Sequence, residues 1–361
     1  MLKIKIFQFI LMKLILWIIM VFSKFRNRVL YLCLSGIFMA SCGLDSGTFV
    51  KSTHFGGALG TSYSITILYP EELNLEREID SVFKVVNYSM STYLPDSDIS
   101  KINQGDSNIV VDKMFRDVFE LSKEVYSDTE GYFDPTVGAL VNAWGFGPGK
   151  QLALDSTKVD SILQFVGFDK VRLTEKGTVI KNDPRIFFDF NAIAKGYAID
   201  RLAELLDQKD IENYLIEVGG EIIAKGENKL KQKSWIVGID DPQVEEGRRL
   251  KLTLQLRDNA MASSGNYRKF RIDSITGKKF VHTINPKTGY TRDANILAVS
   301  VIAKNCAKAD AYATAMMAME LAESKKLLNL HEQLDAYIIY LEKDGEVKEF
   351  MTPGFKNLVT R

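Results

Sequence analysis

The sequence predicts an α+β fold, because β-like segments and helical segments occupy separate blocks of the chain. Short β-like segments follow one another through 213–226, 234–240, 249–256 and 270–284, as hairpin-forming strands do. Helical periodicity instead dominates 71–90, 112–131 and 191–210. The charge balance, 46 Lys and Arg against 46 Asp and Glu, provides no basic field for nucleic acid. We therefore expect a globular protein without a nucleic-acid partner.

Residues 1–41 are predicted to be an export signal rather than part of the fold. Two apolar runs flank a basic segment, and the second run ends in small residues directly before Cys42. The letters "MASCG" resemble a bacterial lipobox, with Met39 where leucine is commonest. The resemblance implies that Cys42 carries diacylglycerol. We therefore expect an exported chain, anchored by lipid to a bacterial membrane and facing the periplasm.

The first apolar run has two explanations. Its length approaches that of a bilayer-spanning helix, so a transmembrane anchor is one of them. The other is a gene start placed too far upstream, because a chain that begins at Met20 has a signal of ordinary proportions. Peptides from residues 2–19 in mass spectra of the purified lipoprotein would reject the later start.

A polar tether over 42–53 is predicted to lead into a single domain over 54–361. Alternating residues predict a half-buried strand over 61–69. Amphipathic helices are predicted over 71–90 and 112–131, the second ended by Gly131. No Pro-rich or Ser-rich linker divides this region.

The second half of the domain begins with β-like sequence over 171–190, which runs directly into a helix over 191–210. Strands and hairpins follow, and the last predicted strand leads into an alanine-rich helix. These predicted segments are 213–226, 234–240, 249–256, 270–284, the strand 296–305 and the helix 309–322.

Cysteine and histidine are scarce. Cys33 lies in the signal and Cys42 is the predicted lipid site, so Cys306 is left alone in the mature chain without a disulfide partner. A buried, unreactive thiol is the expected state of Cys306. Of the three histidines, His54 and His331 have no expected role. His282 instead stands before an Asn-Pro and Thr-Gly turn, so its imidazole is offered at the end of a strand.

Asp310 and Thr314 are the first candidates for chemistry. They are four residues apart on a predicted helix, so the carboxylate and the hydroxyl project from one face. Two oxygen ligands suit a hard cation such as Mg²⁺, which completes its shell with substrate phosphates and water. The alternative is that Asp310 caps or charges the helix start and Thr314 packs among alanines.

Two further segments are candidates for ligand contact. A helix beginning after Asp189 offers free amides to an anion, and Lys195 adds a positive charge. The segment 131–148 is rich in glycine and aromatic residues, so it either holds a flat ligand or forms core beneath tight turns. Ser264 lies beside Gly265 where backbone can approach a ligand, but no G-x-S-x-G context supports it as a nucleophile.

In this order, these segments resemble the FAD:protein FMN transferase family, the ApbE-like flavin transferases. The resemblance covers nearly the whole mature chain. It runs through eight collinear blocks: "LGTSYSITI", "MSTYLPDSDISKIN", "GYFDPTVGALVNAWGFGP", "DFNAIAKGYAIDRLAELL", "YLIEVGGEI", "SSGNYRKF", "HTINPKTG" and "ADAYATAMMAM". It implies an ApbE-like α/β roll with mixed or antiparallel sheets and flanking helices. It also implies Mg²⁺-dependent transfer of FMN from FAD to a threonine hydroxyl of an acceptor protein, with release of AMP.

The resemblance also assigns roles to residues. Asp310 and Thr314 are the implied side-chain ligands of Mg²⁺, and Ala192 is the implied backbone-carbonyl ligand. The implied FAD contacts are Leu59, Tyr93, Tyr132, Phe133, Asp134, Asp189, Lys195 and the backbone around Ile284. Leu59 stands where many members have methionine, and Asn285 replaces a common aspartate after the "HTI" letters.

A mechanism follows from these roles. Phosphoryl transfer is catalysed chiefly by positioning and electrostatic stabilisation, which Mg²⁺ and Lys195 supply. A threonine hydroxyl is a weak nucleophile, so a base such as His282 is expected to accept its proton. The implied acceptors are exported subunits of sodium-pumping NADH:quinone reductase or of Rnf-type complexes. Two alternatives stay open: an Mg²⁺-dependent FAD pyrophosphatase giving FMN and AMP, and a non-catalytic flavin-binding lipoprotein.

Overall fold

The computed structural model describes residues 13, 48–244, 249–265, 270–272, 279–281, 283–291 and 295–361. The chain divides into two units, Met1–Thr48 and Phe49–Arg361, and the fold described below is that of the second. The predicted export signal and the predicted lipid site Cys42 lie outside the described residues. Within the part of the chain that the structure describes, no helix has both the length and the apolar character needed to cross a membrane.

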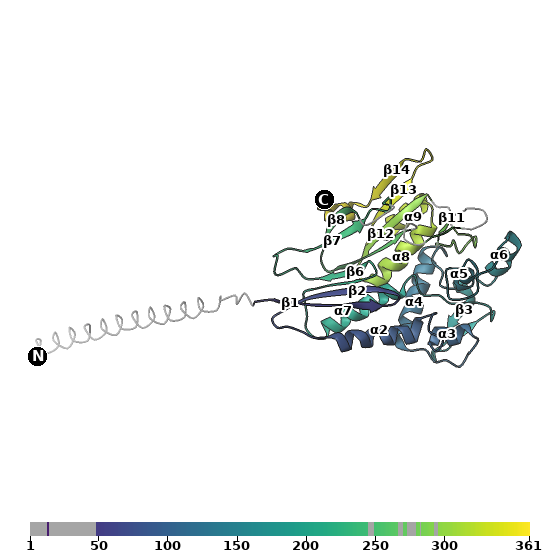
Figure 1. Ribbon diagram of the computed structural model, residues 1–361, viewed down its shortest axis with the longest axis horizontal. Helices are drawn as coiled ribbons and strands as arrows, with labels where there is room; N and C mark the ends of the chain where they lie inside the picture. Colours follow the sequence, from purple (N-terminus) through teal and green to yellow (C-terminus); the bar gives the residue numbers. More distant parts are fainter. Residues whose placement is uncertain are drawn as a thin grey trace, which may run out of the picture. The chain divides into compact units, whose positions relative to one another are not determined.

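An eight-stranded sheet forms the centre of the second unit (Figure 1). Every neighbouring pair in it is antiparallel. In spatial order its strands are β1 (Val50–Ala58), β2 (Thr61–Tyr69), β5 (Tyr214–Val218), β6 (Glu221–Lys225), β9 (Asn259–Gly265), β12 (Ile296–Ala303), β13 (Asp335–Leu341) and β14 (Val347–Met351).

Two of the hairpins in this sheet are closed by two-residue turns with positive φ. Leu59 (φ 51°) and Gly60 (φ 73°) connect β1 to β2, and Gly219 (φ 63°) and Gly220 (φ 105°) connect β5 to β6. Such turns match the right-handed twist of the flanking strands. The Gly219 amide donates a hydrogen bond to the Ser62 carbonyl at 3.0 Å, so the two turns lie side by side.

The largest part of the core lies between the sheet and a layer of helices. Ile65, Ile216 and Val299 from three strands are fully buried there against apolar faces of the helices. The helices of this layer are α2 (Glu76–Met90), α3 (Asp98–Asn103), α4 (Lys113–Asp128), α7 (Ala194–Asp207), α8 (Cys306–Ala318) and α9 (Leu321–Leu330). Helix α8 is almost wholly buried, because its residues are small and let it sit directly on the sheet.

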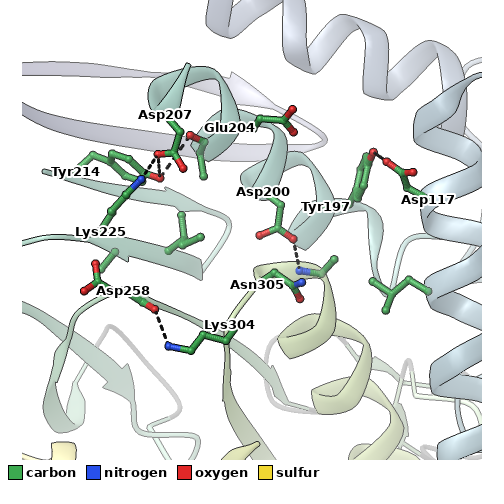
Figure 2. A pocket seen from close by; sticks show the side chains of 15 residues that line it. Asp117, Tyr197, Asp200, Glu204, Asp207, Tyr214, Lys225, Asp258, Lys304 and Asn305 are labelled. Atoms are coloured by element: carbon green, nitrogen blue, oxygen red, sulfur yellow. Dashed lines mark hydrogen bonds and ion pairs between the residues drawn. The ribbon is translucent and has the colours of Figure 1, made fainter. Parts of the chain in front are cut away.

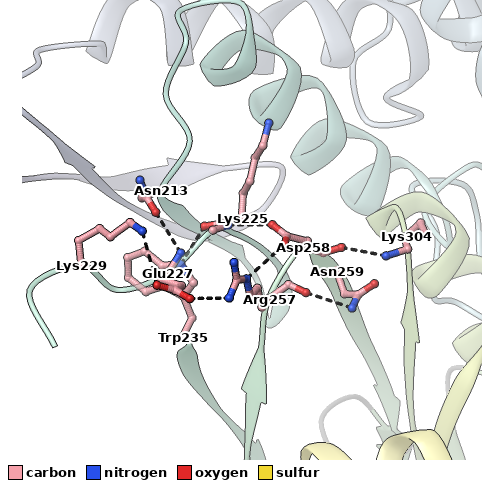
Figure 3. Close-up of polar contacts among 10 residues, drawn as sticks. Asn213, Lys225, Glu227, Lys229, Trp235, Arg257, Asp258, Asn259 and Lys304 are labelled. Atoms are coloured by element: carbon pink, nitrogen blue, oxygen red, sulfur yellow. Dashed lines mark hydrogen bonds and ion pairs between the residues drawn. The ribbon is translucent and has the colours of Figure 1, made fainter. Parts of the chain in front are cut away.

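The hairpin of β7 (Trp235–Asp240) and β8 (Leu250–Leu256), together with α10 (Pro353–Leu358), contributes to a second core cluster. Val237, Leu254 and Phe355 pack there with residues of the large sheet. Polar contacts hold the entry to this hairpin (Figure 3). The Trp235 indole donates to the Lys225 carbonyl at 2.9 Å, and Glu227 forms ion pairs with Arg257 and Lys229.

A smaller cluster joins α5 (Gly138–Ala143) and α6 (Ser156–Leu163) to the loop around Ile284. The Trp144 indole donates to the Gly289 carbonyl at 2.9 Å and so fixes that loop. The remaining short elements are η1 (Phe168–Lys170), β3 (Val171–Leu173), β4 (Val179–Lys181), β10 (Phe270–Ile272) and β11 (Lys279–Val281).

The α+β prediction is confirmed, but the structure differs from the sequence prediction in places. Strand β1 begins at Val50, inside the segment 42–53 that was predicted to be a tether and before the predicted domain start at 54. The segment 185–190 forms no strand and makes only an isolated parallel bridge, between Phe187 and Val137. Its backbone groups bond elsewhere: the Phe188 amide donates to the Asn103 side chain at 2.7 Å, and the Asp189 amide to the Pro135 carbonyl at 2.8 Å.

Candidate functional site

Asp310 is buried, 4% exposed, at the contact between α7 and α8. Its carboxylate accepts a hydrogen bond from the Gly196 backbone amide at 3.1 Å. That amide lies in the first turn of α7, where helical N–H groups have no intrahelical acceptor, so Asp310 supplies one. The Ala192 carbonyl, just before the N-cap Ile193, accepts no hydrogen bond among the described residues.

Thr314 lies one turn further along α8. Its hydroxyl and that of Ser264, near the end of β9, are 3.3 Å apart, and Thr314 is half-buried. Ser264 is paired with Val299 of β12, so the sheet fixes the backbone that carries the Ser264 hydroxyl. The structure thus confirms that Asp310 and Thr314 lie on one helix, and it places them against α7 and β9 respectively.

Lys195, at the start of α7, forms an ion pair with Glu221, the first residue of β6. The Lys195 side chain is 31% exposed, whereas that of Glu221 is only 4% exposed. The second carboxylate oxygen of Glu221, Oε2, is buried and has no hydrogen-bond partner among the described residues. Sequence reasoning missed Glu221, and no local signal marks it, because its contact with Lys195 joins positions 26 apart in the chain.

Three charged groups therefore share one buried region. Burial raises the pKa of Asp310 to about 7, although the charge of Lys195 acts to lower it. Burial lowers the pKa of Lys195, but the carboxylates of Asp310 and Glu221 outweigh it and leave that pKa above its usual value. The pKa of Asp310 and the pKa of Lys195 thus each depend on the charge of the other.

The oxygen donors present suit a hard divalent cation. The Asp310 carboxylate, the Thr314 hydroxyl, the free Ala192 carbonyl and the orphaned Glu221 oxygen are all donors of the kind that Mg²⁺ prefers. Within the described residues no three His, Cys, Asp or Glu side chains gather as a metal cluster. A magnesium site that takes one carboxylate, a hydroxyl and a carbonyl from the protein does not require one.

Asp189 and Tyr93 lie close enough for their charges to interact. Burial, and then the charge of Asp189, raises the pKa of the Tyr93 phenol. The Asp189 carboxylate is 9% exposed and accepts the Asn191 amide at 2.7 Å, and burial raises its pKa. Tyr93 is 61% exposed, so its ring is available to a ligand.

Side chains of the aromatic segment 131–148 differ in how deeply they are buried. Phe133 is buried in the main core, and the Asp134 carboxylate accepts hydrogen bonds from the Thr136 amide and hydroxyl at 2.8 and 2.6 Å. Burial raises the pKa of Asp134 to about 6. Tyr132 is half-buried, with the Lys287 ammonium 4.4 Å from its ring centre. The core alternative therefore describes Phe133 and Trp144, which are buried in two clusters, with Phe146 packed against the second.

The other two predicted FAD contacts lie on loops. Leu59 occupies the β1–β2 turn, beside the turn that leads to Glu221, because the Gly219 amide bonds to Ser62. Ile284 is 7% exposed, and its side chain belongs to the same buried cluster as Trp144. The predicted base His282 lies outside the described residues. Cys306 is buried, and burial raises the pKa of its thiol, as expected for an unreactive cysteine.

A cavity of about 580 Å³ lies along α7 (Figure 2). Its lining runs from Tyr197 to Asp207 on that helix and includes Lys225 of β6. Polar groups that line it are paired, for example Asp207 with Lys225 at 2.8 Å. Lys195, Glu221 and Asp310 are not among the lining residues, although Tyr197 lies two positions after Lys195.

The sequence of this chain is similar to a family of known proteins. Residues 59–338 match the model of the ApbE family. The chain is 34% identical over 348 residues to an FAD:protein FMN transferase of Haemophilus influenzae, covering 90% of this chain and 97% of the relative. It is 31% identical to an FAD:protein FMN transferase of Vibrio cholerae, covering 86% and 94%.

Solved structures agree with this match. The flavin transferase ApbE from Vibrio cholerae superimposes with a TM-score of 0.76 at 30% identity, covering 86% of this chain and 99% of that one. The ApbE protein from Thermotoga maritima gives a TM-score of 0.75 at 25% identity, covering 87% and 100%. The similarity therefore extends over the whole described domain rather than over one motif.

Proposed function

The chain belongs to the ApbE family, and from that premise we propose that it is an FAD:protein FMN transferase. The observation that carries the proposal is the buried junction of α7, α8 and β6, where Asp310, Lys195 and Glu221 meet. Relatives that match most of this chain are named for the same activity. The substrate is FAD, and the acceptor is a protein hydroxyl, which we take to be that of a threonine.

In the proposed reaction, the acceptor oxygen attacks the phosphorus of the FMN half of FAD. A new P–O bond forms, the P–O bond to the AMP phosphate breaks, and AMP leaves. The proton of the acceptor hydroxyl passes to His282, whose ordinary pKa near 6.5 suits it to a near-neutral compartment. Lys195, Asp189 and the exposed ring of Tyr93 would orient FAD at the junction.

We propose Mg²⁺ as the metal, held by Asp310, Thr314 and the Ala192 carbonyl. Bound there, it would neutralise charge on the phosphoryl oxygens and ease departure of AMP. Lys195 adds a fixed positive charge beside the same oxygens. Such positioning and charge stabilisation are the main contributions to phosphoryl transfer.

We further propose export and lipid anchoring through Cys42, with the enzyme facing the periplasm. The acceptors that we propose are exported flavin-bearing subunits of sodium-pumping NADH:quinone reductase or of Rnf-type complexes. Globomycin, which blocks cleavage at lipoboxes, is a direct check. Accumulation of the uncleaved precursor is expected on treatment, and unchanged electrophoretic mobility would contradict the lipid anchor.

Incubation of the purified protein with FAD tests the function. With Mg²⁺ and a threonine-bearing acceptor, we expect AMP release together with FMN bound to the acceptor, and excess EDTA should abolish both. AMP release that does not need the acceptor would instead indicate an FAD pyrophosphatase. Absence of AMP release under all conditions would indicate a flavin carrier.

His282→Ala is expected to lower the rate of transfer about 10²- to 10⁴-fold, since that is the usual contribution of a general base. FAD binding, measured by flavin fluorescence, should change far less, because the base acts on the acceptor rather than on FAD. His331→Ala is the matched control, because His331 is the C-cap of α9 and its contacts are with Asp128, Tyr312 and Gln333. Transfer by His282→Ala at the wild-type rate would show that another group accepts the proton.

A further inference from the structure

Glu221 is buried at a cost that its surroundings must offset. It is 3% exposed, and a carboxylate in such a place is unfavourable unless it is paired. Lys195 is the partner with which it forms an ion pair, and Oε2 accepts no hydrogen bond within the described part of the chain. Hydrogen bonds to the rest of the fold therefore do not account for the burial of the Glu221 carboxylate. Its ion pair with Lys195 does.

The hairpin is built to deliver this side chain. Gly219 and Gly220 both adopt positive φ, and the Gly220 amide donates to the Glu217 side chain at 2.7 Å. Glu221, the first residue of β6, is paired with Val218 of β5 across this turn. The Gly219–Gly220 turn thus positions Glu221 beside Lys195 in the first turn of α7.

Two carboxylates, those of Glu221 and Asp310, exert their charge on Lys195. It forms its ion pair with Glu221, while Asp310 is held by the Gly196 amide at 3.1 Å. If Glu221 lost its charge, Asp310 would be the remaining carboxylate for the buried ammonium. An ammonium paired with Asp310 would compete with any cation for the same oxygens.

We propose that Glu221 is a positioning residue, which holds the Lys195 ammonium and so leaves Asp310 to bind a divalent cation. The inference rests on the proposed function, because it assigns the cation to Asp310. The two carboxylates and one ammonium leave the junction with a net negative charge, which favours a divalent cation. With Glu221 neutral, the charges of Lys195 and Asp310 would cancel.

Calorimetric titration with Mg²⁺ tests this without reference to turnover. Glu221→Gln preserves the shape of the side chain and is expected to weaken Mg²⁺ binding about tenfold or more. Adding Lys195→Met to that variant removes the competing ammonium. The double variant is therefore expected to bind Mg²⁺ within about threefold of wild type, a coupling that a double-mutant cycle measures.

Glu217→Gln is the matched control, since it removes a carboxylate from the same hairpin while keeping an acceptor for the Gly220 amide. Its Mg²⁺ affinity should stay within about twofold of wild type. Thermal melts of every variant separate lost binding from lost folding. A folded Glu221→Gln variant with unchanged Mg²⁺ affinity would overturn the inference. So would a double variant that binds Mg²⁺ as weakly as Glu221→Gln alone.

The second of those outcomes would make Glu221 a ligand of the cation rather than the counter-ion of Lys195. A wild-type chain that transfers FMN but binds no Mg²⁺ would also overturn the inference and leave the proposed activity standing. A wild-type chain that binds Mg²⁺ in the expected pattern but transfers no FMN would leave the inference standing and refute the activity.

Discussion

Asp310→Ala is expected to reduce FMN transfer about 10³-fold or more, because loss of the cation removes several kcal/mol of transition-state stabilisation. The fold should survive. Loss of the carboxylate leaves the first-turn Gly196 amide without its acceptor, at a cost of about 1–3 kcal/mol. Removal of a buried charge also removes its desolvation cost. Steady-state AMP release and a thermal melt give the two quantities.

Lys308→Ala is the control for this substitution. Lys308 lies on the same helix, two residues before Asp310, and pairs at the surface with Glu124 at 2.6 Å. Surface pairs of this kind contribute little, so both activity and melting temperature should stay near the wild-type values. Retention of more than about a tenth of the wild-type rate by Asp310→Ala would contradict its assignment as the main metal ligand.

Gly196→Ala is expected to lower the free energy of unfolding by about 1–3 kcal/mol or more, the usual cost of overpacking. A Cβ at Gly196 would stand 2.4 Å from the Cys306 carbonyl oxygen and 2.8 Å from the Ala307 Cα. Both are backbone atoms, so no side chain can turn aside to make room. Helices α7 and α8 would have to separate, and Asp310 and Lys195 would move apart with them.

Chemical denaturation measures the loss of stability, and AMP release measures the loss of geometry. Gly57→Ala is the matched control, because a Cβ there would meet only the Thr61 carbonyl, at 3.8 Å. That variant should unfold at nearly the same denaturant concentration as wild type. Equal stability of Gly196→Ala and wild type would show that the two helices are not packed backbone to backbone as described.

Local patterns predicted most of the secondary structure. Alternation predicted the strand 61–69, and β2 has those bounds. Helical periodicity predicted 112–131 with Gly131 as its stop, and α4 ends at Asp128 with Gly131 at φ 84°. Strand β1 was missed, because the pairing of Val50 with Tyr69 depends on a hairpin partner rather than on its own sequence.

Spacing alone placed Asp310 and Thr314 on one helix, but it could not supply their neighbours. Gly196 is 114 positions from Asp310 along the chain, and Ser264 is 50 positions from Thr314. Such contacts arise only when α7, α8 and β9 pack together. Glu221 was missed for the same reason, since a glutamate after two glycines has no chemical meaning until Lys195 is brought beside it.

The segment 131–148 shows a choice that sequence alone leaves open. Its aromatic and glycine content was compatible with a ligand pocket or with core, and burial decides between them residue by residue. Phe133 is core, whereas Tyr132 remains half-buried beside Lys287. Sequence cannot make this division, because both residues belong to one motif.

The most direct test is the intact mass of a threonine-bearing acceptor after incubation with the purified protein, FAD and Mg²⁺, with released AMP counted in the same sample. We predict a single FMN adduct on the acceptor, one AMP for each adduct, and neither product with Asp310→Ala. Free FMN and AMP with an unmodified acceptor, or adduct formation that survives the loss of Asp310, would contradict the account.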